Sequence, residues 1–386
     1  MVKRIPLDNV CAKKIPTLSS QYDGLIDYVD ISSVDNAEKR IVSMQCVSAK
    51  EAPSRAKQLL EVGDILVSTV RPNLNAVAMV EQQTDNLLVG STGYCVLRCN
   101  DSIDKRYVFH FCQSPYFIDD MTSQATGASY PAVSSGIVKS STIPDHPIEK
   151  QKLIADCLDK VSELIALRKE QLAKLDQLVK SRFIELFGEP LTLLESGKTI
   201  SLEKVFSEIT VGFVGEAASS YVKVGIPYLR TQNVRKGYID FSGLIYVSEE
   251  FHGANRKSQI KPGDIVVSRV GVNRGMAAVI PQTLEEANIA NCLIIKKEKT
   301  VNSEYLAYYL NMSYGLSPKF GASVGSAQGV INTAILKKWE VFLPPYSQQE
   351  QFAAFVKQTD KSKLAIQQSL DKLELLKKSL MQEYFG

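Results

Sequence analysis

The sequence predicts an α/β fold of the α+β kind, in which a mixed globular domain of about 150 residues and a long amphipathic helix occur twice. Three observations predict it. A strand-forming block recurs 200 residues further along the chain, short β-type runs alternate with helical stretches in both halves, and each half ends in a long apolar stripe of helical spacing. We expect two globular domains separated by two long helices, packed as an antiparallel coiled coil with pseudo-twofold symmetry.

The repeat is clearest in the block Gly-Asp-Ile-Leu-Val-Ser at 63–68, which matches Gly-Asp-Ile-Val-Val-Ser at 263–268. The same offset of 200 aligns 28–34 with 228–234. Further matches at offsets of 195 and 198 align 7–10 with 202–205, 171–175 with 369–373, and 187–188 with 385–386. Several blocks in the same order, with nearly equal offsets, indicate an internal duplication with short loop insertions.

Each globular half contains short strand-forming runs bounded by turn signals, with helical stretches among them. The glycine-aspartate pairs of the repeated block are turn residues that start a buried strand. We therefore expect a curled, largely antiparallel sheet in each half. The expected strands are 64–70, 76–80 and 94–98, then 244–247, 264–270, 277–280 and 292–295, and the expected helices are 105–113 and 303–311.

A long helix follows a proline-containing boundary in each half and ends at Phe187 or Phe385, where the next glycine suits a C-cap. Apolar residues recur at alternating steps of three and four, as in a coiled coil. Core packing alone would explain such a stripe, but its width indicates more than one partner helix. The predicted division is 1–146, 147–188, 189–344 and 345–386. The expected partner-helix interface is Leu158, Leu164, Leu172, Leu175, Leu178, Ile366, Leu370, Leu373 and Leu376.

The composition, with 45% hydrophobic and 23% charged residues, is that of a soluble globular protein. Neither a membrane-spanning run nor a signal-peptide pattern is visible, so we expect a cytoplasmic protein. The seven cysteines have no framework spacing and there are only three histidines, so we expect reduced thiols and no metal. A net charge of +3 means that a nucleic-acid surface would have to arise from local clustering.

Motifs of the common enzyme classes are absent, including phosphate-binding loops, the nucleophile elbow, His-Glu-x-x-His and the Asn/Asp-Pro-Pro-aromatic motif of amino-methyltransferases. Pro344-Pro345-Tyr346 follows a leucine at a helix boundary. The glycine loop 212–215 has no clear strand before it and no helix after it. We interpret both as structural, and we expect no catalytic site and no cofactor.

Polar residues follow the repeated strand in both halves, while the framework around them is kept. Arg, Asn and Gln can contact base edges in the major groove, and Lys, Ser and Thr suit phosphates. For any single residue, a solvated surface charge is the alternative. As a set, divergent loops on a shared frame are typical of two readers of different sequences. The candidate DNA-binding residues are Arg71, Asn73, Asn75 and Tyr130, then Arg230, Gln232, Asn233, Arg235, Arg269, Asn273 and Arg274, with Arg55 as a further basic residue.

Over essentially its whole length, the chain resembles the specificity-subunit (HsdS) family of Type I restriction-modification systems. The resemblance rests on the order domain, helix, domain, helix, on the duplicated blocks, on Tyr-Leu-Arg-Thr-Gln-Asn-Val at 228–234, and on Pro-x-x-x-Gln at 147–151 and 345–349. One departure is that Asp30 and Ile31 stand where Arg230 and Thr231 stand, so base-reading roles do not transfer between halves.

The resemblance implies that 1–146 and 189–344 are target-recognition domains, each reading one half of a bipartite double-stranded DNA site. It also implies that the helices set the gap between the half-sites and dock two methyltransferase subunits, with a restriction and translocase subunit joining them. Catalysis would then belong to the partners, which accounts for the missing motifs.

Two other function classes are compatible with parts of the sequence. A methyltransferase would need a cofactor loop and the Asn/Asp-Pro-Pro-aromatic motif, and the sequence has neither. A coiled-coil scaffold with protein-binding globular ends would leave the divergent Arg- and Asn-rich loops unexplained.

Overall fold

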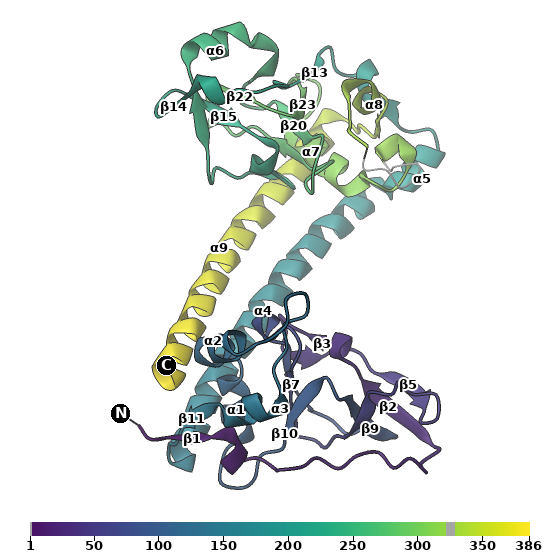
Figure 1. Cartoon of the computed structure of the whole chain (residues 1–386). Coiled ribbons are helices and arrows are strands. Elements are labelled where there is room, and N and C mark those ends of the chain that lie inside the picture. The colour runs from purple at the N-terminus through teal and green to yellow at the C-terminus, as the bar shows by residue number, and fades with distance from the viewer. Residues whose placement is uncertain (1, 322–328) are drawn as a thin grey trace. The chain divides into compact units, whose positions relative to one another are not determined.

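The computed structural model describes residues 2–321 and 329–386, which form two compact units (Figure 1). Unit 1 comprises Met1–Leu172 and Ala365–Gly386, and unit 2 comprises Ala173–Leu364. Each unit contains one mixed α/β domain and segments of both long helices, which confirms the expected fold class and the duplication. None of the helices described is long and apolar enough to cross a membrane.

Unit 1 is built on a four-stranded sheet and a three-stranded sheet. The strand order is β5-β2-β9-β6 in the larger sheet, where β2 and β9 run parallel and the other neighbours antiparallel. The smaller sheet, β10-β7-β8, is antiparallel and confirms the three strands expected in this half. The bounds are β2 Leu25–Val29, β5 Gln45–Ser48, β6 Ala56–Leu59, β7 Ile65–Ser68, β8 Val77–Met79, β9 Leu87–Ser91 and β10 Tyr94–Leu97.

Two small strand pairs and three short helices complete this domain. All four residues of β7 are buried, and the apolar core beneath the smaller sheet includes Tyr107 and Phe111 of α1. Asp104 caps α1 by accepting from the backbone N–H groups of Arg106 and Tyr107. The remaining elements are β1 Arg4–Pro6 paired with β11 Thr142–Pro144, β3 Val34–Asp35 paired with β4 Arg40–Ile41, α1 Lys105–Phe111, α2 Pro115–Ser123 and α3 Ser135–Ser140.

Unit 2 repeats this plan with a four-stranded antiparallel sheet, β13-β23-β20-β21, and a five-stranded sheet, β14-β18-β15-β22-β19. The pair β15 and β22 is parallel, as β2 and β9 are in unit 1. The four strands and the helix expected in this half are confirmed. The bounds of the strands are β12 Ile200–Ser201, β13 Ile209–Val211, β14 Tyr221–Val222, β15 Ile226–Leu229, β16 Val234–Arg235, β17 Tyr238–Ile239, β18 Ile245–Val247, β19 Gln259–Ile260, β20 Ile265–Ser268, β21 Ala277–Val279, β22 Ala287–Ile289, β23 Cys292–Ile295 and β24 Glu340–Val341; the shorter helices are α5 Pro190–Glu195, α6 Glu249–Ala254, α7 Ser303–Ser313 and α8 Thr333–Lys337.

The glycine loop at 212–215 corrects one expectation, because the strand β13 does lead into it. Gly212 donates its N–H to the carbonyl of Cys292 at 2.8 Å, and a Cβ at this position would collide with the carbonyl of Ile289. The glycine therefore permits close backbone packing. The next element is the 3-10 helix Ala218–Ser220 and not an α-helix, so the loop remains structural.

The long helices α4, Ile148–Phe187, and α9, Tyr346–Phe385, pack antiparallel within each unit. In unit 1, Lys169 lies 3.4 Å from Glu374, whereas Tyr384 lies beside Cys157 near the start of α4. Residue numbers therefore increase along α4 as they decrease along the facing part of α9, so the two helices run antiparallel. In unit 2, the Lys363 ammonium lies 2.6 Å from Asp176, and the ring of Phe352 packs on that of Phe183 near the end of α4, with centroids 5.4 Å apart.

The residues expected at the partner-helix interface divide into two groups. Leu158 and Leu370 are buried, and the side chains of Leu172, Leu175, Ile366 and Leu373 are half-buried. By contrast, Leu164, Leu178 and Leu376 are exposed. The first group fits the helix pair, whereas the second leaves apolar side chains in solvent.

The duplication extends to single hydrogen bonds at the start of each long helix. Gln151 of α4 accepts through Oε1 from the backbone N–H of Asp104, and Gln349 of α9 accepts in the same way from Asn302, both at 2.9 Å. Each glutamine also donates through Nε2 to a carbonyl five residues earlier in the chain. The Pro-x-x-x-Gln helix starts are therefore anchors that fix each helix to the capping residue of its domain's helix.

Candidate nucleic-acid interface

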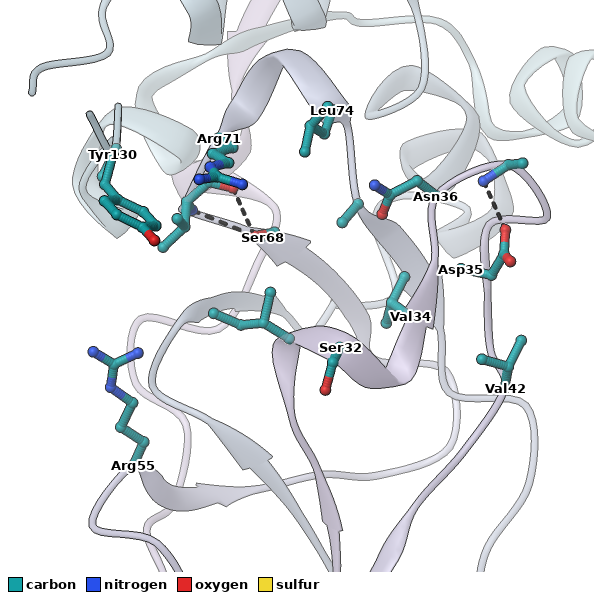
Figure 2. A pocket seen from close by; sticks show the side chains of 15 residues that line it. Ser32, Val34, Asp35, Asn36, Val42, Arg55, Ser68, Arg71, Leu74 and Tyr130 are labelled. Carbon is teal, nitrogen blue, oxygen red and sulfur yellow. Dashed lines mark hydrogen bonds between the residues drawn. The ribbon is translucent and has the colours of Figure 1, made fainter. Parts of the chain in front are cut away.

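Unit 1 carries a hollow of about 990 Å³ beside the loop that follows the repeated strand β7 (Figure 2). Figure 2 shows Arg71 and Tyr130 on one rim with Arg55 on the same side, while Asp35 and Asn36 lie across the opening. Apolar side chains lie between them. The lining residues are Ile31, Ser32, Val34, Asp35, Asn36, Ala37, Val42, Arg55, Ser68, Val70, Arg71, Leu74, Ala76, Tyr130 and Ala132.

Arg71 and Tyr130 are distant in sequence but lie together in the structure. The guanidinium carbon of Arg71 lies 4.6 Å from the centre of the Tyr130 ring, a cation–π contact. The backbone N–H of Arg71 donates to the carbonyl of Pro131 at 2.7 Å, which ties the two loops together. Tyr130 is nevertheless 68% exposed. The contact therefore presents a positive charge and an aromatic face to the solvent.

The two asparagines after Arg71 differ in their surroundings. Asn73 is exposed on the 3-10 helix Pro72–Leu74. Asn75 is buried, donates to the carbonyl of Cys112 at 2.8 Å, and accepts from the Lys39 ammonium at 2.8 Å. Burial lowers the pKa of Lys39 to about 8. The amide of Asn75 thus holds the loop in place and is not available to a ligand.

In unit 2, the segment 230–235 mixes exposed and structural side chains. Gln232 is exposed, and Arg235 lies 3.3 Å from Asp240. Arg230 is half-buried and donates to the carbonyl of Gly243 at 2.9 Å. Asn233 is buried and donates to the carbonyls at 240 and 242, so its amide is used by the framework.

The loop after β20 lies beside this segment. Asn273 is buried and donates to the carbonyls of Thr231 and Val234 at 3.3 and 3.1 Å, which joins the two loops. Arg269 is half-buried, and its Nε has no hydrogen-bond partner among the described atoms. Arg274 donates to the Tyr314 hydroxyl at 3.0 Å and to a carbonyl at 329. The two loops that carry the arginines of unit 2 are therefore joined through Asn273.

The aligned turns at Asp30 and Arg230 share a backbone form with different side chains. The N–H of Asp30 donates to the Ser33 hydroxyl at 3.0 Å, and the N–H of Arg230 donates to the Asn233 side chain at 2.9 Å. The position three residues later therefore closes both turns. The frame is duplicated, and the side chain at its first position has diverged.

Sequence reasoning did not single out Asn36, which the hairpin β3–β4 brings to the hollow opposite Arg71. The sequence feature that could have pointed to it is a difference in charge between the two repeats, because Asp35-Asn36 aligns with Arg235-Lys236. No group of three or more His, Cys, Asp or Glu side chains in the described ranges could hold a metal ion.

The family model described as the Type I restriction modification DNA specificity domain matches residues 7–177 and 207–375. The chain belongs to this family. The two matched segments correspond to the two repeats, so the specificity domain is duplicated within one chain.

Among curated relatives of this specificity-domain chain, the Type I restriction enzyme MjaVIII specificity subunit of Methanocaldococcus jannaschii is 23% identical over 310 residues, covering 76% of this chain and 72% of the relative. The EcoKI specificity subunit of Escherichia coli K12 is 20% identical over 352 residues, covering 86% and 75%. The chain is thus similar to specificity subunits over most of their length.

Two solved structures share the fold of this specificity-domain chain. A chain from a structure on complex assembly and conformational transition of the type I R-M system superposes with a TM-score of 0.60 at 23% identity, covering 99% of this chain and 97% of that one. The S subunit of a Type-I restriction-modification system from M. genitalium has a TM-score of 0.59 at 13% identity, covering 100% and 96%.

Proposed function

We propose that this chain is the DNA-recognition subunit of a Type I restriction-modification complex, and that each globular domain binds one half of a bipartite duplex site. The observation that carries the proposal is the pair of arginine-bearing loops that follow β7 and β20. They stand on a duplicated frame and differ in side chains. A duplicated framework whose loops carry different side chains is what we expect of two domains that bind different half-sites.

In unit 1, the proposed DNA contacts are Arg71, Asn73 and Tyr130, with Arg55 on the same rim. An exposed guanidinium can bind a phosphate or the O6 and N7 atoms of guanine, and an exposed amide can bind adenine. The stack of Arg71 on Tyr130 restricts the arginine to fewer orientations, which lowers the entropy lost on binding. Asn75 is not among the proposed DNA contacts, because its side-chain amide is hydrogen-bonded to Lys39 and to the carbonyl of Cys112.

In unit 2, the proposed contacts are Arg230, Gln232, Arg235, Arg269 and Arg274. These side chains are exposed or half-buried, and they lie on two loops that the amide of Asn273 joins. Asn233 and Asn273 support the surface and do not read bases. The aligned hairpins differ at their second and third residues, which are Asp35-Asn36 in unit 1 and Arg235-Lys236 in unit 2. This difference in charge favours different sequence preferences for the two domains.

The two helices are proposed to serve as the spacer between the half-sites and as the docking surface for two methyltransferase subunits. Each helix has 40 residues, or roughly 60 Å at 1.5 Å per residue. The exposed Leu164, Leu178 and Leu376 lie on this docking surface, because the antiparallel pair does not bury them. In this proposal the functional division is 1–146, 147–188, 189–344 and 345–386.

Catalysis is assigned to the partners: methylation to the modification subunits, and cleavage to a restriction and translocase subunit. The absence of enzyme motifs from the sequence supports this assignment. The complex would act on cytoplasmic DNA.

Selection from randomised duplexes tests the proposal, with the full chain assembled with its methyltransferase subunit. We expect enrichment of a site with two specified halves and an unspecified gap. Arg71→Ala should relax one half only. Lys50→Ala should leave both halves unchanged, because this exposed lysine pairs with Asp23 at 3.5 Å and does not line the hollow. If no bipartite sequence is enriched, a scaffold role replaces this one.

A further inference from the structure

Four of the seven cysteines gather in one part of unit 1. Cys11, Cys95 and Cys112 are buried in the core beneath the smaller sheet, and the half-buried Cys99 packs against it. The remaining cysteines lie elsewhere, with Cys46 exposed. None of these four cysteines belongs to the proposed DNA contacts or to the docking surface on the helices.

Cys11 and Cys99 face each other directly across an antiparallel bridge. The flanking residues make the backbone hydrogen bonds: Ala12 N–H donates to the carbonyl of Arg98 at 2.8 Å, and Asn100 N–H donates to the carbonyl of Val10 at 3.0 Å. This pattern defines a non-hydrogen-bonded pair, in which the Cα atoms are about 4.5 Å apart and the side chains are closest. Disulfides span Cα distances of roughly 4.4–6.8 Å, so the backbone already permits the bond.

The two thiols are also chemically unequal. A hydrogen bond from the Cys99 thiol lowers the pKa of Cys11 despite the opposing effect of burial, and the same contact raises the pKa of Cys99. The ammonium of Lys139 lies next to Cys11 and donates to the carbonyls of Ala12 and Lys13 at 2.7 and 3.1 Å. Because the thiolate is the reactive form, Cys11 is the nucleophile of the pair.

The neighbouring cysteines provide an internal contrast. Burial raises the pKa of Cys95 to about 11, and it raises the pKa of the fully buried Cys112 well above the ordinary thiol value. Both therefore stay protonated and unreactive. The chemistry distinguishes one pair from the other two core cysteines.

We propose that Cys11 and Cys99 are an oxidation site that hydrogen peroxide converts reversibly into a disulfide. The Cys11 thiolate attacks one peroxide oxygen, the O–O bond breaks, and a sulfenic acid forms while hydroxide leaves and takes up a proton to become water. The Cys99 sulfur, on losing its proton, then attacks the Cys11 sulfur. The sulfenic hydroxyl leaves with that proton as a second water, so two thiols are oxidised as one peroxide is reduced.

The cross-link would tie the N-terminal segment of unit 1 to residue 99. This segment also contacts β11, the end of α9 and Tyr116. The N-terminal strand β1 pairs with β11 directly before α4. Arg4 in that strand donates to the carbonyl of Phe385 at 3.2 Å, and its guanidinium lies 4.0 Å from the ring centre of Tyr116. A bond from Cys11 to Cys99 closes a loop of about 88 residues, which restricts the unfolded chain strongly.

The direct test is peptide mapping of the full chain after treatment with hydrogen peroxide and then N-ethylmaleimide. We expect one intramolecular cross-link, between the peptides of Cys11 and Cys99, with the loss of two hydrogens and full reversal by dithiothreitol. Cys11→Ala and Cys99→Ala should abolish it, and the control Cys46→Ala should not. A cross-link to Cys95 or Cys112, or sulfinic acid at Cys11 without a cross-link, overturns the proposal.

A second measurement remains informative if the alanine variants fold poorly. In the unmodified chain, oxidation should raise the melting temperature by roughly 5 °C or more, because the closed loop is long. It should also slow trypsin cleavage after Lys13 and Lys14, which lie beside the new bond. An unchanged melting temperature and cleavage rate in a fully cross-linked sample would contradict the fastening role.

Discussion

The aspartate of the repeated Gly-Asp-Ile block should be a main source of stability in each unit. Asp64 is 1% exposed and accepts two hydrogen bonds from the Arg98 guanidinium, at 2.8 and 2.7 Å, and a third from the backbone N–H of Glu61. The same arginine binds Glu61 at 2.6 Å, but the Glu61 side chain is 65% exposed. One guanidinium therefore has a buried and an exposed carboxylate partner.

Asp64→Asn should destabilise unit 1 by about 2–3 kcal/mol. Breaking a buried ion pair typically costs ~3–5 kcal/mol, and the value is lower here because the Arg98 side chain is 20% exposed and can partly recover its hydration. Glu61→Gln is the matched control and should cost at most about 1 kcal/mol, as exposed pairs do. The equivalent change in unit 2 is Asp264→Asn, which removes a carboxylate 2.9 Å from the Lys296 ammonium.

Urea unfolding followed by circular dichroism measures these differences, and hydrogen exchange of the β7 amides assigns them to unit 1. We expect the free energy of unfolding of Asp64→Asn to be well below that of Glu61→Gln, which should be close to that of the unmodified chain. Equal losses for the two variants would refute the reasoning, because they would show that burial does not decide the value of the pair.

Four further outcomes are expected. Phe385→Ala, at a fully buried ring 5.2 Å from that of Tyr107, should cost about 3–4 kcal/mol in urea unfolding, whereas Leu375→Ala at an exposed site should cost under ~0.5. Arg269→Ala should weaken binding to one half-site by about 1–3 kcal/mol in titrations with each half-site mutated in turn; equal loss at both halves would count against a base contact. Deleting two heptads from both α4 and α9 should change the preferred gap between half-sites, and an unchanged gap in the selected duplexes would contradict the spacer role. Burial lowers the pKa of His110 despite its hydrogen bond to Asp159, so this histidine is protonated at a higher pH in the unfolded chain than in the folded one. The free energy of unfolding should therefore be highest above about pH 6.5 and decrease as the pH falls below that value. The decrease should be smaller in His110→Gln when urea midpoints at pH 7.5 and 5.5 are compared.

The duplicated framework was predictable from the sequence because its signals are local and occur twice. The blocks at 63–68 and 263–268 became β7 and β20, and the helix ends at Phe187 and Phe385 are as expected. Proline fixes φ and lacks an N–H donor, whereas glycine adopts left-handed conformations that other residues avoid, so both mark the ends of helices from the local sequence. The family followed from the order of these blocks, and the matched family model confirms it.

The accessibility of single side chains was not predictable in the same way. Asn73 and Asn75 look alike in sequence, but Asn75 bonds to a carbonyl 37 residues away and is buried. Likewise, the strand before Gly212 was missed because β13 has only three residues and depends on its partner β23. Such features are set by contacts between distant parts of the chain, which a local pattern does not record.

The glutamines at the starts of the two long helices have a further consequence. Gln151 and Gln349 each bind a capping residue and a preceding carbonyl, so neither helix can turn about its axis relative to its domain without breaking two bonds. With 3.6 residues per turn, each inserted residue rotates every later side chain by about 100°, whereas seven residues rotate it by only about 20°. The phase of each helix is thus set at its first turn, and length variants should be tolerated in steps of seven.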